Sequence, residues 1–298
     1  MAAKRAWDAA AKDVWVLDGA CGTELAKRGL PAGAAPELWN ADRPEAVEQV
    51  ARGYVEAGAD ILLTNTLGGT RVALARHGLA DRTEELNRLG AEISCRAAAC
   101  RAFVFASVGP TGEMLEPLGA ATEAGLVDAF AEQMAALLVG GADGFCIESM
   151  SDLGEALAAL RAARRVGGGR PVVVSMTFAR GARGYATMMG VRPEQAARAL
   201  SEAGADVIGS NCGNGIAGMV EVACLMRGAT DRPLWMKANA GVPELVGGRT
   251  VFRETPEAMA AHVPALIQAG AAFIGGCCGT TPDHIRRIAE VVHAHAAR

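Results

Sequence analysis

The sequence has few aromatic residues, no long apolar run and no cluster of basic residues. No basic run exceeds the pair Arg164 and Arg165, and the net charge is −4, so nucleic acid is not an expected partner. No apolar stretch approaches the length of a membrane span, so no membrane association is expected. Residues 1–12 carry charges throughout and lack the apolar centre of a signal peptide. Eight irregularly spaced cysteines without such a signal favour a cytoplasmic location, where thiols stay reduced.

The sequence also lacks a low-complexity linker that would divide it into domains. Its 298 residues, 51% of them hydrophobic, suffice for one large core, so residues 1–298 are expected to form one domain. Residues 18–23, Asp-Gly-Ala-Cys-Gly-Thr, match neither the dinucleotide-binding nor the P-loop pattern. A doubly wound sheet usually carries such a glycine-rich loop after its first strand, so this fold is the less favoured alternative.

One phrase recurs four times, beginning at Glu56, Gly140, Glu202 and Gln268. In each copy a helix end is followed by a glycine and a short apolar run, as expected of a helix C-cap that leads into a buried strand. With the other apolar runs this gives eight candidate strands, at residues 14–17, 61–64, 103–108, 144–148, 172–176, 207–209, 234–238 and 273–276. Helical segments such as 122–139 and 193–203 lie between most of them. Eight alternating units in a chain of this length predict a single α/β domain, a (β/α)8 TIM barrel.

Three cysteines follow two of these strands in similar contexts. Cys212 lies in Gly-Ser-Asn-Cys-Gly, and Cys277 and Cys278 lie in Gly-Gly-Cys-Cys-Gly. Adjacent cysteines are poor disulfide partners, because their Cα atoms lie about 3.8 Å apart and a disulfide needs roughly 4.4–6.8 Å. Three thiolates from two strand ends suit one tetrahedral zinc with an open fourth position, as in catalytic sites. The alternative is that they are small buried hydrophobes, but the flanking glycines leave open backbone beside each sulfur.

Polar residues occupy the expected carboxyl ends of other strands, where TIM barrels place their active sites. The candidates for substrate binding are Asp18, Gly19, Thr64, Asn65, Glu148 and Asn239. Asp18 and Glu148 suit recognition of a substrate ammonium, with helix capping or a salt bridge as the alternative. Asn239 can equally be an ordinary turn residue. The cysteines expected in helix or strand interiors, Cys95, Cys100, Cys146 and Cys224, are assigned to the core.

The chemistry expected of this set is alkyl transfer to a thiol. A coordinating sulfur must be a thiolate, so a thiol that enters the open zinc position would lose its proton. Four sulfur anions around one dication leave excess negative charge, and the incoming sulfur should remain nucleophilic at neutral pH. A non-catalytic metal or redox protein with vicinal thiols is the alternative, and it leaves the role of Asp18, Glu148 and Asn239 without explanation.

Five motifs carry a resemblance to a known family. They are Asp-Gly-Ala-Cys-Gly-Thr-Glu-Leu at 18–25, Thr-Asn-Thr at 64–66, Gly-Pro-Thr at 109–111, Gly-Ser-Asn-Cys at 209–212 and Gly-Gly-Cys-Cys-Gly-Thr-Thr-Pro at 275–282. Nearly end to end, the sequence resembles the zinc-dependent homocysteine S-methyltransferases, which form methionine. The resemblance implies that Cys212, Cys277 and Cys278 bind Zn2+, with the homocysteine sulfur as fourth ligand. It also implies that Asp18, Gly19 and Glu148 hold the amino-acid end of homocysteine, and that Asn239 lies near the metal.

The methyl donor is left open by the sequence. No Asp-x-His-x-x-Gly corrinoid signature occurs, since Asp283 and His284 adjoin, and His284 is assigned to the last helix rather than to the metal. The donor is therefore expected to be a small molecule, such as betaine, S-methylmethionine or S-adenosylmethionine, or a methyl group on a separate corrinoid protein. Cationic donors are often held by aromatic cages, and only Trp39, Phe178 and Tyr185 fall near the expected rim, which favours a protein-borne methyl group. Another thiol acceptor, or a demethylating role in a corrinoid pathway, is the nearest alternative function.

Overall fold

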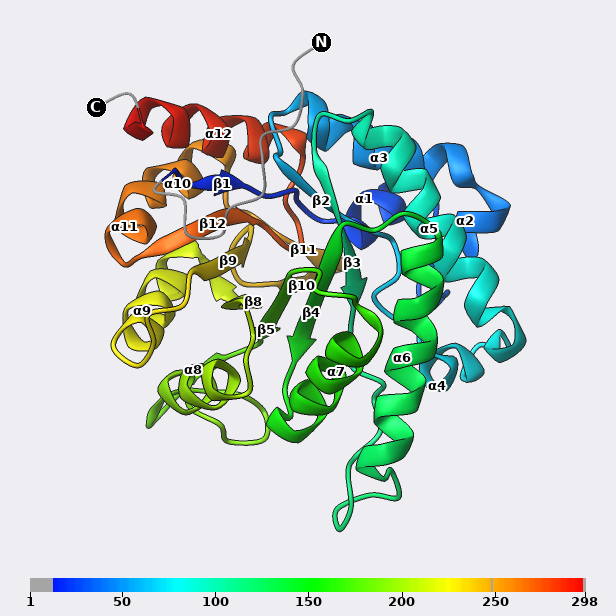
Figure 1. Ribbon diagram of the computed structural model, residues 1–298. Coiled ribbons are helices and arrows are strands. Elements are labelled where there is room, and N and C mark those ends of the chain that lie inside the picture. Colours follow the sequence, from blue (N-terminus) through cyan, green and yellow to red (C-terminus); the bar gives the residue numbers. More distant parts are fainter. Residues whose placement is uncertain (1–12, 248, 297–298) are drawn as a thin grey trace.

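The centre of the protein is a barrel of eight parallel strands surrounded by helices (Figure 1). The computed structural model describes residues 13–247 and 249–296. The strand order around the barrel is β1-β12-β9-β8-β5-β4-β3-β2. A parallel bridge between Leu17 and Ile61 brings the two ends of this sheet together. The predicted TIM barrel is confirmed, and the alternative of a doubly wound sheet is excluded, because that sheet is open at both edges.

The barrel strands are β1 (Trp15–Val16), β2 (Ile61–Leu63), β3 (Phe103–Val108), β4 (Gly144–Met150), β5 (Val172–Met176), β8 (Val207–Gly215), β9 (Leu234–Asn239) and β12 (Ala271–Gly276). All eight strands predicted from the sequence are present. The largest difference is at β8, which was expected to end at residue 209 and continues to Gly215. Its pairing with β9 shifts register between Cys212 and Gly215, and apolar patterning does not reveal such an irregular strand end.

Helices alternate with the strands along the chain. They are α1 (Gly22–Lys27), α2 (Trp39–Asp42), α3 (Pro44–Glu56), α4 (Arg71–Ala75), α5 (Thr83–Ala98), α6 (Glu123–Val139), α7 (Leu153–Val166), α8 (Pro193–Glu202), α9 (Ile216–Arg227), α10 (Pro256–Ala261), α11 (Val263–Gln268) and α12 (Pro282–Ala296), with the 3-10 turns η1 (Pro36–Leu38) and η2 (Ala80–Arg82). The helical segments expected at 122–139 and 193–203 are α6 and α8. Thr122 caps α6, because its side chain accepts a hydrogen bond from Gly125 N.

The recurring phrase has one structural role in all four copies. Its glycines Gly58, Gly141, Gly204 and Gly270 have φ of +100°, +99°, +87° and +88°, a conformation that ends a helix and that side chains rarely adopt. In three copies an aspartate follows two residues later. Its carboxylate accepts a hydrogen bond from the N–H of a barrel strand: Asp60 from Val16, Asp143 from Val104 and Asp206 from Val172. The phrase therefore ends a helix and fixes the start of a strand.

Five aromatic residues lie together inside the barrel. Trp15, Phe103, Phe105, Trp235 and Phe273 belong to one buried cluster, and the rings of Trp235 and Phe273 are 5.5 Å apart. A larger apolar cluster includes residues from both the strands and the helices. Cys146 belongs to the inner cluster, which confirms its assignment to the core. The same assignment is wrong for Cys100, which lies beyond the end of α5, and for Cys224 of α9, since both are exposed. Cys95 is partly buried, so it lies at the edge of the core.

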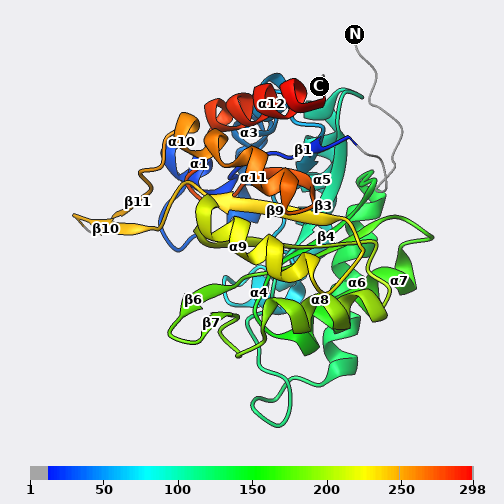
Figure 2. The same ribbon diagram turned by 90° about the vertical axis from the view of Figure 1, so that its left-hand side faces the viewer.

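Two hairpins project from the same side of the barrel (Figure 2). The hairpin of β6 (Ala179–Gly181) and β7 (Gly184–Ala186) follows β5, and the hairpin of β10 (Glu244–Val246) and β11 (Arg249–Val251) follows β9. Both therefore lie at the carboxyl ends of barrel strands. Within 13–247 and 249–296, no helix is both long enough and apolar enough to cross a membrane.

Candidate metal and substrate site

Three sulfur atoms lie together at the carboxyl ends of β8 and β12, with Cys212 in the last part of β8 and the other two cysteines just after β12. The Sγ atoms of Cys212, Cys277 and Cys278 all lie within 4.8 Å of one another, and those of Cys212 and Cys277 are 3.0 Å apart. All three are free thiols and partly exposed, so a ligand can reach the cluster. This donor set fits a tetrahedral zinc whose fourth position is open. No other group of three or more His, Cys, Asp or Glu in the described part of the chain has this spacing.

Strand β9 fixes both segments that carry these cysteines. Cys212 pairs with Ala238 in the register of β8 and β9, and Cys277 N donates a hydrogen bond to Ala238 O at 2.7 Å. Cys212 has φ of +59°, which is disfavoured for a residue with a side chain. Such backbone strain is typical of functional sites, where surrounding structure imposes it. Cys212 and Ala238 form the last pair of β8 and β9 before the register shifts. The strained backbone at this position directs the thiol of Cys212 toward Cys277.

The side chain of Asn211 connects the sulfur cluster to two strand ends. Its Nδ2 lies 3.6 Å from Cys212 Sγ and 3.9 Å from Cys277 Sγ, and it donates to Ser149 Oγ at 2.8 Å. Its Oδ1 accepts hydrogen bonds from Ser149 N at 2.9 Å and from Ser175 Oγ at 2.7 Å. Five contacts hold this amide in one orientation, with its N–H groups toward the sulfurs. Amide donors stabilise thiolates, so Asn211 is a site residue that the sequence analysis did not single out.

A cavity of about 190 Å³ adjoins the sulfur cluster. Its lining includes the three cysteines and five of the six predicted substrate-binding residues: Asp18, Gly19, Thr64, Asn65 and Glu148. The sixth, Asn239, ends β9 outside this lining and donates from Nδ2 to Gly213 O at 3.1 Å. Residues that the sequence separates by more than two hundred positions therefore share one small space, which is suited to an amino acid with a thiol.

The side chains of two lining residues, Thr64 and Asn65, form hydrogen bonds with neighbouring residues. Thr64 Oγ1 accepts a hydrogen bond from Ser107 N at 2.9 Å. Asn65 Nδ2 donates to Pro36 O at 2.8 Å and to Asn40 Oδ1 at 2.9 Å. These contacts fix the wall of the cavity opposite the cysteine-bearing strands. A direct substrate contact by either side chain stays a prediction.

Lys237 is a site residue that the sequence analysis did not identify. It lies in the middle of β9, is 2% exposed, and its Nζ forms an ion pair with Asp18 Oδ1 inside the cavity lining. Burial alone would lower the pKa of Lys237, but the charges of Asp18 and Glu148 outweigh it and raise that pKa above its usual value. Lys237 is therefore a cation at neutral pH. A lone lysine inside an apolar strand was the available signal, because such a charge is rarely buried unless it is paired.

Three carboxylates line the cavity. Glu37 accepts a hydrogen bond from Gly68 N at 2.6 Å, and the other two, Asp18 and Glu148, both interact with the charge of Lys237. Asp18 is bound by Lys237 and accepts a hydrogen bond from Leu63 N at 2.7 Å, and these contacts reduce the rise that burial causes in its pKa. Glu148 accepts a hydrogen bond from Ser107 Oγ at 2.6 Å, and burial raises its pKa to about 7. Lys237 balances one of the two carboxylates. When both are ionised, the cavity keeps one net negative charge from this group, which suits one substrate ammonium.

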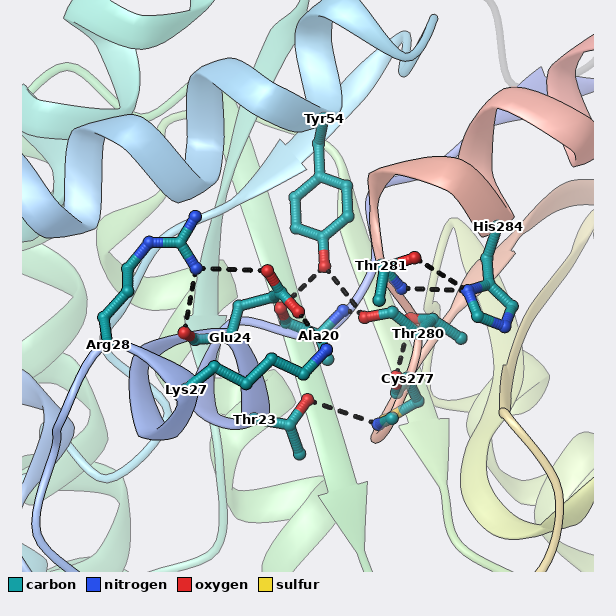
Figure 3. A network of polar contacts seen from close by, with 11 residues as sticks. Ala20, Thr23, Glu24, Lys27, Arg28, Tyr54, Cys277, Thr280, Thr281 and His284 are labelled. Carbon is teal, nitrogen blue, oxygen red and sulfur yellow. Dashed lines mark hydrogen bonds and ion pairs between the residues drawn. The ribbon is translucent and has the colours of Figure 1, made fainter. Parts of the chain in front are cut away.

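A network of polar contacts holds the segment after β1 against the segment that carries Cys277 (Figure 3). Tyr54 of α3 donates its hydroxyl to Ala20 O at 2.8 Å, with Thr280 O at 3.2 Å as a second acceptor. Thr280 Oγ1 donates to Cys277 O at 2.7 Å, and Ala20 N donates to Thr280 Oγ1 at 3.1 Å. The cysteine-bearing turn and the Asp18-Gly19 turn are thus fixed to each other. His284 lies in α12 and contacts Thr281, outside the sulfur cluster, as the sequence predicted.

Known proteins are similar to this chain over nearly its whole length. A family model described as homocysteine S-methyltransferase matches residues 15–292. Methionine synthase of Mycobacterium tuberculosis is 34% identical over 304 residues, which cover 96% of this chain and 25% of that protein. Methionine synthase of Mycobacterium leprae is 34% identical over 301 residues, which cover 95% of this chain and 24% of that protein. The chain thus spans about a quarter of the length of these curated relatives.

Solved structures of one bacterial enzyme share the fold. The metallated form of the homocysteine methyltransferase MmuM from Escherichia coli has a TM-score of 0.77 and 24% identity, and covers 93% of this chain and 96% of that one. Its oxidized form has a TM-score of 0.73 and 25% identity, with 93% and 95% of the two chains covered. The barrel and its surrounding helices are therefore common to both proteins.

Proposed function

The chain belongs to the homocysteine S-methyltransferase family, and we propose that it transfers a methyl group to the thiol of homocysteine to form methionine. Cys212, Cys277 and Cys278 would hold Zn2+ as thiolates. Zinc bound there would lower the pKa of a coordinated substrate thiol and so supply a nucleophilic sulfur at neutral pH.

One observation carries this proposal: the three sulfurs and the charged group of Asp18, Glu148 and Lys237 line the same cavity. A thiol amino acid has a sulfur at one end and an ammonium at the other, and the cavity offers a partner for each. Of the two carboxylates that interact with Lys237, Asp18 forms the ion pair and Glu148 accepts the hydroxyl of Ser107, so Glu148 is the proposed ammonium acceptor. Asn211 would keep the cysteine thiolates in place during the transfer.

The alternatives make different predictions about the acceptor. A general zinc-thiolate transferase would accept thiols without an ammonium, and a non-catalytic vicinal-thiol protein would transfer no methyl group. The decisive assay incubates zinc-loaded protein with homocysteine and, in turn, betaine, S-methylmethionine, S-adenosylmethionine or methylcobalamin, and measures methionine. 4-Mercaptobutyrate, which lacks the ammonium, should be a far poorer acceptor. Equal rates with both acceptors would contradict homocysteine as the specific substrate.

Glu148→Gln should raise the KM for homocysteine about tenfold or more, because a charged hydrogen bond contributes roughly 1.5–3 kcal/mol. The pKa of Glu148 is raised to about 7, so the carboxylate becomes protonated as the pH falls below 7. The wild-type advantage in kcat/KM should therefore be largest near pH 8 and shrink toward pH 6. Steady-state kinetics of both proteins across this range give the ratio, and zinc content should stay unchanged. A ratio that does not vary with pH would remove Glu148 from the ammonium site.

Gly19→Ala should destabilise the protein and weaken homocysteine binding. A Cβ at Gly19 would lie 2.7 Å from both Thr280 Oγ1 and Tyr54 Cε1, closer than Cβ contacts occur. The two turns of the polar network would have to separate, at a cost of about 1–3 kcal/mol. Gly228→Ala is the matched control, because its Cβ meets only ordinary contacts, the nearest at 3.6 Å. Urea unfolding compares the two variants, and equal midpoints would show that the turns tolerate the added methyl group.

A further inference from the structure

A second cavity lies beside the proposed site and has a different charge. Its volume is about 920 Å³, and the β6–β7 hairpin supplies most of its lining. Arg180, Arg183 and Arg192 line it, and none of the lining residues in the described part of the chain is an aspartate or a glutamate. Three guanidinium groups around one open cavity create a positive potential that attracts oxyanions, because the planar fork of arginine matches phosphate and carboxylate.

This cavity and the metal and substrate site meet at the carboxyl ends of β4 and β5. Ser149 lines the first cavity, and Ser151, two residues later, lines the second. Thr177 lines the second cavity and donates from Oγ1 to Asn211 O at 3.1 Å, next to Cys212. Figure 2 shows the β6–β7 hairpin on the side of the barrel where the β10–β11 hairpin also projects. A ligand in the second cavity would thus lie beside the approach to the sulfur cluster.

The arginines are available to a ligand. Arg180 pairs with Glu221 at 3.1 Å and Arg192 with Glu194 at 3.7 Å, and both arginine side chains are about 60% exposed, at 63% and 60%. Such exposed pairs contribute only about 0–1 kcal/mol, so an anion can displace them. Among described residues, Arg183 has no carboxylate within ion-pair distance. These three side chains can therefore turn toward one bound anion.

The three aromatic residues that the sequence analysis placed near the rim do not suit a cationic ligand, and of these Tyr185 lines the second cavity. The guanidinium of Arg180 lies 5.8 Å from the ring centroid of Tyr185, so the face that could hold a sulfonium already faces a cation. Phe178 is buried, and the guanidinium of Arg43 lies 5.0 Å from the ring centroid of Trp39. The three aromatic residues that the sequence places near the rim thus form no open cage. The local chemistry favours a negatively charged ligand over a positively charged one.

We propose that this cavity binds the oxyanionic group, phosphate or carboxylate, of the methyl donor and so places the methyl group beside the homocysteine sulfur. The proposal rests on the proposed function. In the transfer, a bond forms between the methyl carbon and the sulfur, and the bond between the methyl carbon and the donor breaks. The bonding electron pair stays on the donor, and the thiol proton has already left to solvent on binding, so no oxidant or reductant is needed.

Calorimetric titration with inorganic pyrophosphate tests whether the cavity is an anion site. Wild-type protein should bind at low ionic strength, and Arg183→Met should bind about tenfold more weakly, because each charge-assisted contact is strong but partly screened here. The variant with Arg180, Arg183 and Arg192 all replaced by methionine should show no binding. Arg101→Met is the control, because Arg101 is exposed just before β3, at the amino-terminal end of the barrel. Absent wild-type binding, or equal binding by the triple variant, would overturn the proposal.

Methyl transfer tests whether the site serves the donor. Methylcobalamin carries a phosphodiester, whereas methyl iodide is small and uncharged. The triple variant should lose about 30-fold or more in kcat/KM with methylcobalamin, yet keep the wild-type rate of zinc-dependent homocysteine methylation by methyl iodide. Wild type and triple variant are also compared with methylcobalamin bound to a carrier protein. This second comparison shows whether the cavity recognises free methylcobalamin or methylcobalamin on a protein.

The outcomes distinguish failure of the proposed methyl transfer to homocysteine from failure of the anion-site proposal. If methyl iodide gives no methionine above the zinc-free background, the proposed function fails, whatever the pyrophosphate titration shows. If S-methylmethionine is used and methylcobalamin is not, the anion in the cavity is the donor's carboxylate, and the triple variant should lose about 30-fold or more in kcat/KM for S-methylmethionine. An unchanged kcat/KM for S-methylmethionine in the triple variant would overturn the anion-site proposal. If methylcobalamin is used equally well by wild type and triple variant, the cavity has no part in donor binding and the proposal also fails.

Discussion

Cys212→Ala is expected to abolish tight zinc binding and homocysteine methylation while the barrel stays folded. The remaining thiols of Cys277 and Cys278 come from adjacent residues and cannot complete a tetrahedral site with one open position. The fold should persist, because the side chain of Cys212 is only partly buried and its removal leaves no large cavity in the core. Metal analysis should find about one zinc per wild-type chain and little in the variant, with Zn–S distances of about 2.3 Å by X-ray absorption in the wild type.

Cys21→Ala is the matched control for this experiment. Cys21 lines the same cavity, but its Sγ contacts Asn65 Oδ1 at 3.4 Å and it is not part of the sulfur cluster. Its zinc content should equal that of the wild type. Circular dichroism and thermal unfolding of the metal-free proteins show whether loss of zinc is separate from loss of structure. The site assignment is wrong if the variant lacking all three cluster cysteines retains one zinc per chain.

Lys237→Met is expected to cause the largest loss of stability among single substitutions in the cavity. Methionine matches the length of lysine but leaves the buried carboxylate of Asp18 without its cation. Removing one partner of a buried ion pair typically costs about 3–5 kcal/mol, since the desolvated charge stays behind. Urea unfolding at pH 7 measures the effect. Lys237→Arg, which keeps the charge, should lose less, although the larger group must fit the same space.

The pH dependence and a second substitution make this prediction specific. Burial already raises the pKa of Asp18, and loss of Lys237 should raise it further. A carboxylate with a raised folded-state pKa favours folding only when it is protonated, so the loss should be small near pH 4 and grow as the pH rises. Asp18→Asn combined with Lys237→Met removes both charges and should recover much of the stability. A double variant as unstable as Lys237→Met alone would contradict the ion-pair explanation.

The charged group at the cavity explains how one small site can select an amino acid. Asp18 and Lys237 neutralise each other within the barrel wall, and Glu148 is held only by the neutral hydroxyl of Ser107. Within this group of three side chains, a substrate ammonium would therefore meet one uncompensated carboxylate rather than two. A bound ammonium would in turn favour the ionised form of Glu148 and lower its pKa. Substrate binding and the charge state of Glu148 should be coupled, as the pH dependence of Glu148→Gln would reveal.

The sequence by itself determined the barrel and the sulfur cluster. The apolar runs predicted all eight strands, because strands of a parallel barrel are buried on both faces and need no alternation of polar residues. The recurring glycine is a local requirement of the helix end, so its pattern is readable without tertiary information. The cluster of Cys212, Cys277 and Cys278 could also be predicted, because each cysteine lies at the carboxyl end of a strand and these strand ends in a barrel meet on one face.

Only the tertiary structure decided which side chains act together. Lys237 and Asp18 lie 219 positions apart, and they meet because the barrel places β9 and the end of β1 on either side of β12. The conformation of Cys212 and the orientation of Asn211 depend on a register shift that no composition pattern encodes. The burial of Phe178 likewise appears only in the folded barrel. Contacts of this kind depend on closure of the barrel, whereas strand and helix signals depend on neighbours in the chain.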